Sequence, residues 1–347
     1  MKKKLLSIAL GIVIALPLVP KIQTLAAQGE QKVAIEGTTD EYFTIHQPPA
    51  NFNPLKATDS ELKYYGYPAR PTDSSQLNDW EQLVSGKWVM PKFTKTKDKP
   101  HTISNKKADS NLENSINATS KYTDNWSGYV YQSTAYGVRG CWEVPSISSD
   151  YKQGTVSDWV GLGGTTSTTP LVQMGTQERE INGTVTNTVW TEIVGGGYYT
   201  DLPQNVSGIT INPGDQVYAY VYLSDFPSSG CTVTFYFSNR TRGQNTSFFS
   251  KTFPNYADVA TSAEWISERP DYGTSGIPSY DYYPVTKDTA GSKQVDFWAS
   301  QYCTTFGGST YTTLADTSSV YKYYTPTCSP TALSSNGTFY AKWISYY

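Results

Sequence analysis

Histidine is almost absent from this sequence: the 347 residues contain only His46 and His101, and both lie in the first third of the chain. The remaining two thirds offer no imidazole, which excludes there a Ser-His-Asp triad, a Cys-His pair and the usual His-ligated zinc site. An enzyme built on that part has to use carboxylates, amides or hydroxyls. We expect it to need no cofactor and no metal.

Charged side chains are also few, at 16% of the residues, and they are unevenly distributed. Residues 1–120 hold 15 Lys and Arg against 12 Asp and Glu, whereas residues 121–347 hold 12 against 18. The acidic balance of the second part disfavours nucleic acid as a partner. A protein with few surface ion pairs loses little folding stability when its carboxylates are protonated. The composition therefore favours activity at low pH.

Long apolar runs are absent except at the N-terminus, where three lysines precede residues 5–19. This pattern, followed by small residues, predicts a secretory signal peptide over residues 1–27. Pro17 and Pro20 interrupt a run that is short for a membrane span, and no other segment is apolar enough to cross a bilayer. We therefore expect a secreted, extracellular protein without a membrane partner.

Residues 28–116 have the composition of a propeptide, and we expect mostly irregular structure there. The exception is 74–84, where Leu77, Trp80 and Val84 recur at helical spacing behind Asp73 or Ser74 as the N-cap residue.

Residues 87–107 hold seven lysines but one acidic residue, Asp98. Two interpretations stay open. The segment is either a solvated linker, or a basic pro-segment that covers an acidic catalytic face until acidification releases it and cleavage follows between about Lys107 and Lys121. In the second case the propeptide is an intramolecular inhibitor.

Residues 117–347 consist of short alternating runs separated by Gly, Pro, Asn and Ser. In 216–223 (QVYAYVYL) and 231–237 (CTVTFYF) the apolar residues alternate with period two. Such strands, with many turns and no long helical stretch, predict an all-β domain, an antiparallel double-sheet β-sandwich. We expect this domain to be a monomer.

All four cysteines lie in this second part. In an exported chain they predict two disulfides, among three possible connectivities. We expect Cys303 to pair with Cys328, enclosing a segment rich in Thr and Tyr, and Cys141 to pair with Cys231.

Segments of the β region carry a recurring combination of Trp, Gly, Gln and Glu. In chain order they are NWSGYV (125–130), DWVGLGG (158–164), LVQMG (171–175), Trp190-Thr191-Glu192 and AEWISE (263–268). This ordered set resembles the glutamic peptidases, or eqolisins, over most of 120–300. The resemblance implies a concanavalin-like jelly roll whose concave face holds the cleft.

The resemblance also implies roles for single residues. Gln173 and Glu264 match the catalytic pair, Trp190 and Glu192 match a segment that lines the substrate site, and Trp159 matches the strand that precedes the glutamine. Gly163 departs from the pattern, because an acidic residue is expected after Trp-Val-Gly-Leu. This departure concerns the local hydrogen bonds rather than the pair itself.

The chemistry of the pair can be argued from the side chains alone. An unperturbed Glu titrates at about 4.3, so Glu264 can take a proton from water and later give it to the leaving amine under acid conditions. The Gln173 amide has two donors and an acceptor, so it can orient the water and stabilise the oxyanion. The sequence thus predicts a secreted acid endopeptidase with protein and peptide substrates.

Two other classes stay open. A glycoside hydrolase on a similar sandwich would use Glu192 and Glu264 as paired carboxylates, at a separation that decides the reaction. A non-catalytic carbohydrate-binding or adhesive module would use the aromatic surface and show no turnover. The first alternative leaves Gln173 without a role.

Overall fold

The computed structural model describes residues 30–98, 101, 119–148, 153–165, 169–195, 202–224, 231–251, 256–270, 284–306, 310–325 and 327–344. The predicted signal peptide lies outside these residues. So does most of the stretch in which we expect the maturation cleavage.

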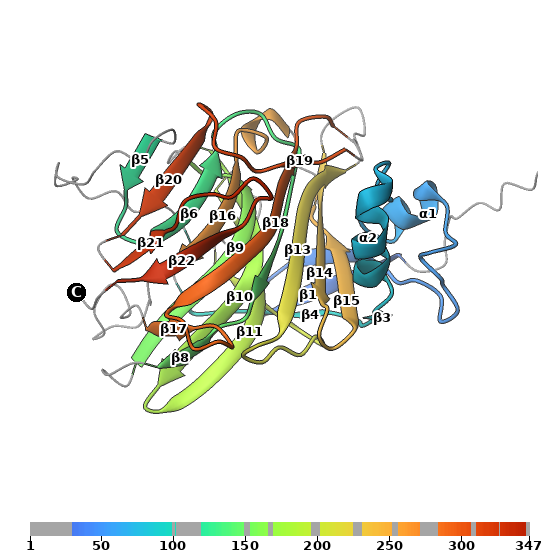
Figure 1. Ribbon diagram of the computed structural model, residues 1–347. Coiled ribbons are helices and arrows are strands. Elements are labelled where there is room, and N and C mark those ends of the chain that lie inside the picture. Colours follow the sequence, from blue (N-terminus) through green and yellow to red (C-terminus); the bar gives the residue numbers. More distant parts are fainter. Residues whose placement is uncertain are drawn as a thin grey trace, which may run out of the picture.

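Most of the described strands form two sheets that face each other, as expected for a β-sandwich, and β1 connects the two at one edge (Figure 1). Sheet 1 has the order β5, β20, β6, β16, β9, β10, β11, β12, β4, β1, antiparallel except for the pairs β5–β20 and β4–β1. Its strands are β1 (Glu30–Glu36), β4 (Lys92–Lys95), β5 (Thr119–Tyr122), β6 (Trp126–Tyr131), β9 (Gln153–Gly163), β10 (Leu171–Ile181), β11 (Thr184–Val194), β12 (Gln204–Ser207), β16 (Ala263–Glu268) and β20 (Val320–Tyr324).

Sheet 2 has the order β21, β22, β18, β7, β13, β14, β15, β2, with β19 beside β18 and β3 beside β15. Its strands are β2 (Tyr42–His46), β3 (Lys87–Trp88), β7 (Gly137–Glu143), β13 (Gln216–Ser224), β14 (Thr232–Asn239), β15 (Gln244–Phe249), β18 (Gln294–Cys303), β19 (Thr312–Thr313), β21 (Cys328–Pro330) and β22 (Phe339–Trp343). Two short strands, β8 (Ser146–Ser148) and β17 (Val285–Lys287), form a separate ribbon.

The main core lies between the sheets and follows from the alternation of the strands. On β13, Val217, Ala219 and Val221 enter this core, whereas Tyr218 and Tyr220 pack on the opposite face in a second cluster. The face predicted for 216–223 is therefore confirmed. A third cluster of Trp126, Val130, Trp159, Leu171, Trp190, Ile266 and Tyr323 covers the other face of sheet 1.

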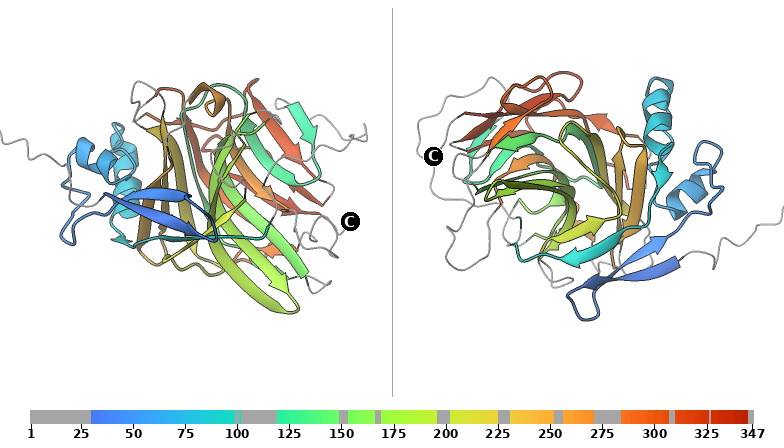
Figure 2. Two further views of the ribbon diagram at one scale, coloured as in Figure 1. Left: turned by 180° about the vertical axis from the view of Figure 1, so that it is seen from behind. Right: turned by 90° about the horizontal axis from the view of Figure 1, so that it is seen from below.

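The N-terminal region contains more regular structure than expected. It contains β1, β2, β3 and β4, the helices α1 (Asp59–Tyr64) and α2 (Leu77–Val84), and a 3₁₀ turn, Ser74–Gln76. β4 pairs with β12, β2 with β15, and β1 with both β4 and β2, so this region joins the two sheets at one edge (Figure 2). The strands were missed because they are short and gain their burial from the sandwich.

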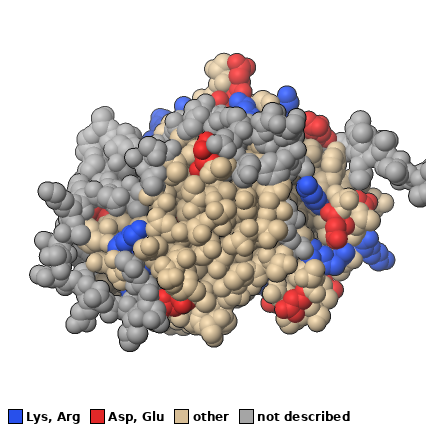
Figure 3. All heavy atoms as spheres, turned by 90° about the horizontal axis from the view of Figure 1, so that it is seen from above, with Lys and Arg blue, Asp and Glu red and all other residues tan. Residues whose placement is uncertain are grey.

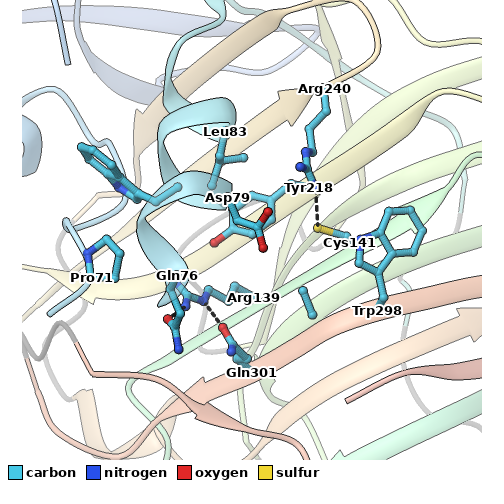
Figure 4. Close-up of a pocket in the computed structure, with 12 residues that line it drawn as sticks. Pro71, Gln76, Asp79, Leu83, Arg139, Cys141, Tyr218, Arg240, Trp298 and Gln301 are labelled. Carbon is cyan, nitrogen blue, oxygen red and sulfur yellow. Dashed lines mark hydrogen bonds between the residues drawn. The ribbon is translucent and has the colours of Figure 1, made fainter. Parts of the chain in front are cut away.

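The helix predicted over 74–84 is confirmed, with Asp73 accepting a hydrogen bond from the Ser75 N–H at its start. Trp80, Leu83 and Val84 are buried against the outer face of sheet 2. A cavity lies between α2 and this face, lined by Arg139, Cys141, Tyr218 and Arg240 among others, and Figure 4 shows it. It is far from the residues that the sequence marks for chemistry.

The two predicted disulfides are wrong. Cys141, Cys231, Cys303 and Cys328 are buried thiols with no disulfide among them. Cys141 and Cys303 pack in the cluster outside sheet 2, whereas Cys231 and Cys328 belong to the main core, so each predicted pair is divided between two clusters. Burial raises the pKa of Cys141 to about 11, which makes this thiol unreactive.

The surface is poor in charge over a broad area, as the view in Figure 3 shows. The described part of the chain contains no helix long and apolar enough to cross a membrane.

Candidate active site

The predicted site residues come together on one face of sheet 1. Gln173 on β10 lies opposite Glu192 on β11 and opposite Gly161 on β9, and Gly161 lies opposite Glu264 on β16. Residues directly opposite each other in a sheet project to the same side. The side chains of Gln173, Glu192 and Glu264 therefore share one face, which we call the site face.

Gly161 keeps the space between Gln173 and Glu264 open. A Cβ atom there would lie 3.1 Å from the Trp159 ring, 3.1 Å from the Val172 carbonyl oxygen and 3.2 Å from the Gln173 Cβ. Two strand spacings, about 10 Å in total, separate the Cα atoms of the pair. The two side chains therefore face each other across a gap without a side chain of its own.

Glu264 is fully buried on this face. Burial raises the pKa of its carboxyl well above the ordinary value, and the nearby Ser262 hydroxyl offsets only part of this effect. Its neighbours across the sheet include Val130, which explains the apolar surroundings. The sequence predicted an ordinary titration, whereas the folded chain holds Glu264 protonated to higher pH.

Gln173 uses both hydrogens of its amide. Nε2 donates to Glu192 Oε2 at 2.8 Å and to the main-chain carbonyl oxygen of His101 at 2.9 Å. Glu192 thus fixes the orientation of the amide, and it also accepts from the His101 N–H at 3.0 Å. Gln173 and Glu192 form one unit that binds both main-chain groups of one residue.

The two predicted tryptophans have different parts in this arrangement. The Trp190 ring stacks on the His101 ring, with centroids 4.1 Å apart and planes at 25°. Trp159 is buried on the same face, two residues before Gly161 on β9. Its Nε1–H donates to Glu268 Oε2 at 2.8 Å. Trp190 therefore contacts the occupant of the site, whereas Trp159 positions a carboxylate.

Three residues of the site were not assigned from the sequence. Glu268 accepts from Asn125 Nδ2 at 2.9 Å and from Trp159, and His101 Nδ1 lies 3.1 Å from its Oε2. Glu268 stands four residues after Glu264 on the same strand, so the period of two could have placed it on the same face. The sequence offered residues 87–107 as a segment that covers the site, but it did not single out His101 as the residue that enters it.

Gly163 cannot be replaced by the acidic residue that the resemblance led us to expect. Its φ of +84° lies in the left-handed region, and a Cβ atom there would come within 2.2 Å of the Pro170 carbonyl oxygen. The local backbone therefore has no room for a side chain.

Within the described residues no three His, Cys, Asp or Glu side chains are grouped so that they could hold a metal ion. The polar groups gathered at the site are instead carboxyls, two side-chain amides and indole N–H groups. Such a set can transfer protons and donate hydrogen bonds to a carbonyl oxygen.

Comparisons with known proteins identify the family of the chain. The chain belongs to the peptidase A4 family, whose model matches residues 124–336, so its resemblance to the glutamic peptidases is confirmed.

Aspergillopepsin-2 from Aspergillus niger is 30% identical over 189 residues, which are 48% of this chain and 63% of that protein. The match thus spans less than two thirds of that relative. Scytalido-glutamic peptidase, solved with a transition state analog inhibitor, is 21% identical, with a TM-score of 0.44 over 64% of this chain and 98% of its own. Aspergilloglutamic peptidase from Aspergillus niger is 21% identical, with a TM-score of 0.35 over 55% of this chain and 99% of its own.

Proposed function

We propose that this chain is a secreted acid endopeptidase that hydrolyses peptide bonds of proteins with Gln173 and Glu264. The observation that carries this proposal is the binding of a main chain in the site: Gln173 donates to the His101 carbonyl oxygen, and the His101 N–H donates to Glu192. A site that pairs with both main-chain groups of one residue is suited to a peptide. Membership of the peptidase A4 family supports the same class of reaction.

In the proposed reaction Glu264 takes a proton from water as the water oxygen attacks the scissile carbonyl carbon. Gln173 Nε2 donates to the carbonyl oxygen and stabilises the negative charge that develops on it. Glu264 then gives the proton to the leaving nitrogen as the C–N bond breaks. Because an amide does not titrate, Gln173 keeps this role at low pH.

The raised pKa of Glu264 fits a site that is closed in this form of the chain. Burial opposes ionisation, so water entering the opened site brings the pKa back toward its ordinary range. Glu264 then ionises at an acid pH at which it can act as the base. Glu192 and Trp190 are proposed to bind substrate, and Trp159 to position Glu268.

We further propose that the N-terminal region inhibits the enzyme until acidification. Lys87 lies on β3 beside β15, and Lys92 and Lys95 lie on β4 between β12 and β1. His101 enters the site. Just before it, Asp98 is buried and paired with Arg179 at 2.9 Å. Cleavage between about Lys107 and Lys121 stays a prediction, as do secretion and the monomeric state.

The glycoside hydrolase alternative is not favoured. Glu192 and Glu264 are separated by β10 and β9, so three strand spacings, about 14 Å, lie between their Cα atoms. The carboxyl groups of paired glycosidase residues are about 5–9.5 Å apart, so these two side chains would have to lean toward each other across Gln173 and Gly161. Glu192 is also engaged by Gln173 and His101.

The test is hydrolysis by purified chain at about pH 3.5, within about one unit of the ordinary pKa of Glu so that part of the Glu264 population is ionised, with denatured casein and with glucans as separate substrates. We expect peptides from casein and no sugar from glucans. Gln173→Ala should lose about 100-fold or more of the casein activity, as expected for removal of an oxyanion donor. The exposed Asp316→Asn is the matched control and should keep full activity. Sugar release without proteolysis would refute the proposal.

A further inference from the structure

The ring of His101 lies in a buried pocket beside Gln173 and Glu192. One face of the ring stacks on Trp190, and Nδ1 lies 3.1 Å from Glu268 Oε2. The exposed fractions of the His101 and Glu268 side chains are 0% and 1%. The pocket therefore offers a flat aromatic wall and one carboxylate to whatever side chain enters it.

Glu268 is held by groups that do not belong to the occupant. Trp159 Nε1 donates to its Oε2 at 2.8 Å, and Asn125 Nδ2 donates to its Oε1 at 2.9 Å. Both donors lie in the sandwich. Hydrogen bonds to a carboxylate fix its orientation. The carboxylate is thus preorganised whether or not His101 is present.

The geometry also says which residue of a peptide enters the pocket. The side chain in the pocket and the carbonyl on Gln173 belong to the same residue, His101. In the proposed reaction that carbonyl is the scissile one. The pocket therefore receives the side chain on the N-terminal side of the bond to be cut.

We propose that the pocket around Glu268 is the main specificity site of the enzyme and selects histidine at the position that supplies the scissile carbonyl. This assignment rests on the proposed peptidase function. Glu268 is a specificity-determining residue here, not one of the catalytic pair. His101 occupies the pocket as an internal ligand of the same chemistry as the substrate.

Three features of a histidine side chain match the pocket together. Its ring is planar and stacks on Trp190, it carries an N–H for Glu268, and at acid pH it is a cation that pairs with a carboxylate. Phenylalanine keeps the stacking but leaves the buried carboxylate facing an apolar edge. Lysine supplies the positive charge but has no flat ring. Glutamine supplies a hydrogen-bond donor but has neither the charge nor the ring. Burying a carboxylate without a matching donor is costly.

The test uses the acid-treated full chain and four peptides that differ only in the residue before one cleavable bond: histidine, phenylalanine, glutamine or lysine. We expect kcat/KM for the histidine peptide to exceed that for the phenylalanine peptide by about 10- to 100-fold, the usual effect of a charge-assisted hydrogen bond. Sequencing of casein fragments should independently find histidine enriched before the cuts.

The Glu268→Gln variant separates specificity from structure. It should lose about 10-fold or more of kcat/KM on the histidine peptide and change less than about threefold on the phenylalanine peptide. Asp316→Asn is again the control, and circular dichroism checks the fold. The proposal would be overturned if the unaltered chain hydrolysed the histidine and phenylalanine peptides at equal rates and histidine were not enriched before the cuts in casein. The proposed peptidase function would still stand in that case. Hydrolysis of none of the peptides and of no casein would instead overturn the proposed function.

Discussion

Gln173 and Glu264 lie on opposite sides of Gly161, all three in one row across β10, β9 and β16. The two functional groups come from segments about ninety residues apart in the chain, and antiparallel pairing alone sets them on the same face. The glycine between them leaves the space that a peptide carbonyl and a water molecule would need.

The first prediction concerns this glycine. Gly161→Ala should lower activity by about 10-fold or more, because the added methyl group displaces Gln173 or Trp159 and small misplacements of catalytic groups are costly. The cost in stability should be about 1–3 kcal/mol from local overpacking. Peptide hydrolysis and thermal unfolding should be measured together. Unchanged kcat/KM in a folded variant would show that the gap has no role in the reaction.

A second prediction concerns Asp158 and Glu178, which are buried between the sheets. Burial raises the pKa of Asp158 to about 7, and burial together with Asp158 raises the pKa of Glu178 well above its usual range. The folded state therefore binds protons more tightly than the unfolded state. By linkage, the free energy of unfolding is greatest below about pH 4 and falls by a few kcal/mol as the pH rises to about 7.

Denaturant unfolding at a series of pH values checks this. Asp158→Asn should flatten the fall between about pH 4 and 7, whereas the exposed Asp316→Asn should leave it unchanged. A chain that gains stability on neutralisation would contradict the assignment.

A third prediction follows from the N-terminal strands. Ile35, Phe43, Ile45 and Phe93 are buried in the main core, and β2 and β4 extend the two sheets. Cleavage between about Lys107 and Lys121 should therefore leave the two fragments associated, since separation would expose core side chains worth about 1.5–3 kcal/mol each.

Gel filtration of the cleaved protein should show one species that denaturing electrophoresis resolves into two. Residues 119–347 produced alone should be less stable or insoluble. A well-folded, active fragment 119–347 would show that the N-terminal strands are dispensable.

A fourth prediction separates inhibition from folding. His101→Ala removes the ring from the pocket while leaving the strands of the N-terminal region in place, so the uncleaved chain should hydrolyse a small peptide faster than the unaltered chain under mildly acid conditions. His46→Ala is the matched control, because His46 stacks on Tyr64 on the outer side of the sandwich. Equal initial rates for all three chains would mean that His101 does not block the site.

The fold and the grouping of Gln173, Glu192 and Glu264 on one face could largely be predicted, the fold from the local alternation of its strands and the grouping from the order of the motifs. Alternation on β13 and β14 fixed the core face, and the motif order identified Gln173, Glu192 and Glu264 as neighbours of one site. What failed depended on long-range packing. The cysteine pairs were wrong because spacing does not say which cluster a side chain enters.

The same limit applies to His101 and to the pKa of Glu264. His101 is a single histidine among lysines, and no sequence pattern indicates that it enters a buried pocket. The raised pKa of Glu264 comes from burial, which depends on neighbours from other strands such as Val130. The N-terminal strands were missed because their few alternating residues become strands by pairing with edges already present in the sandwich.

The central claim is that Glu264 moves the proton in peptide hydrolysis. The most direct measurement is the turnover of one defined peptide by folded Glu264→Gln at about pH 3.5, with the unaltered chain and Asp316→Asn measured alongside. The account predicts a loss of about 1000-fold or more, because a glutamine amide can neither take a proton from water nor return it to the leaving amine. A folded variant that retains activity within about tenfold of the unaltered chain would contradict the mechanism.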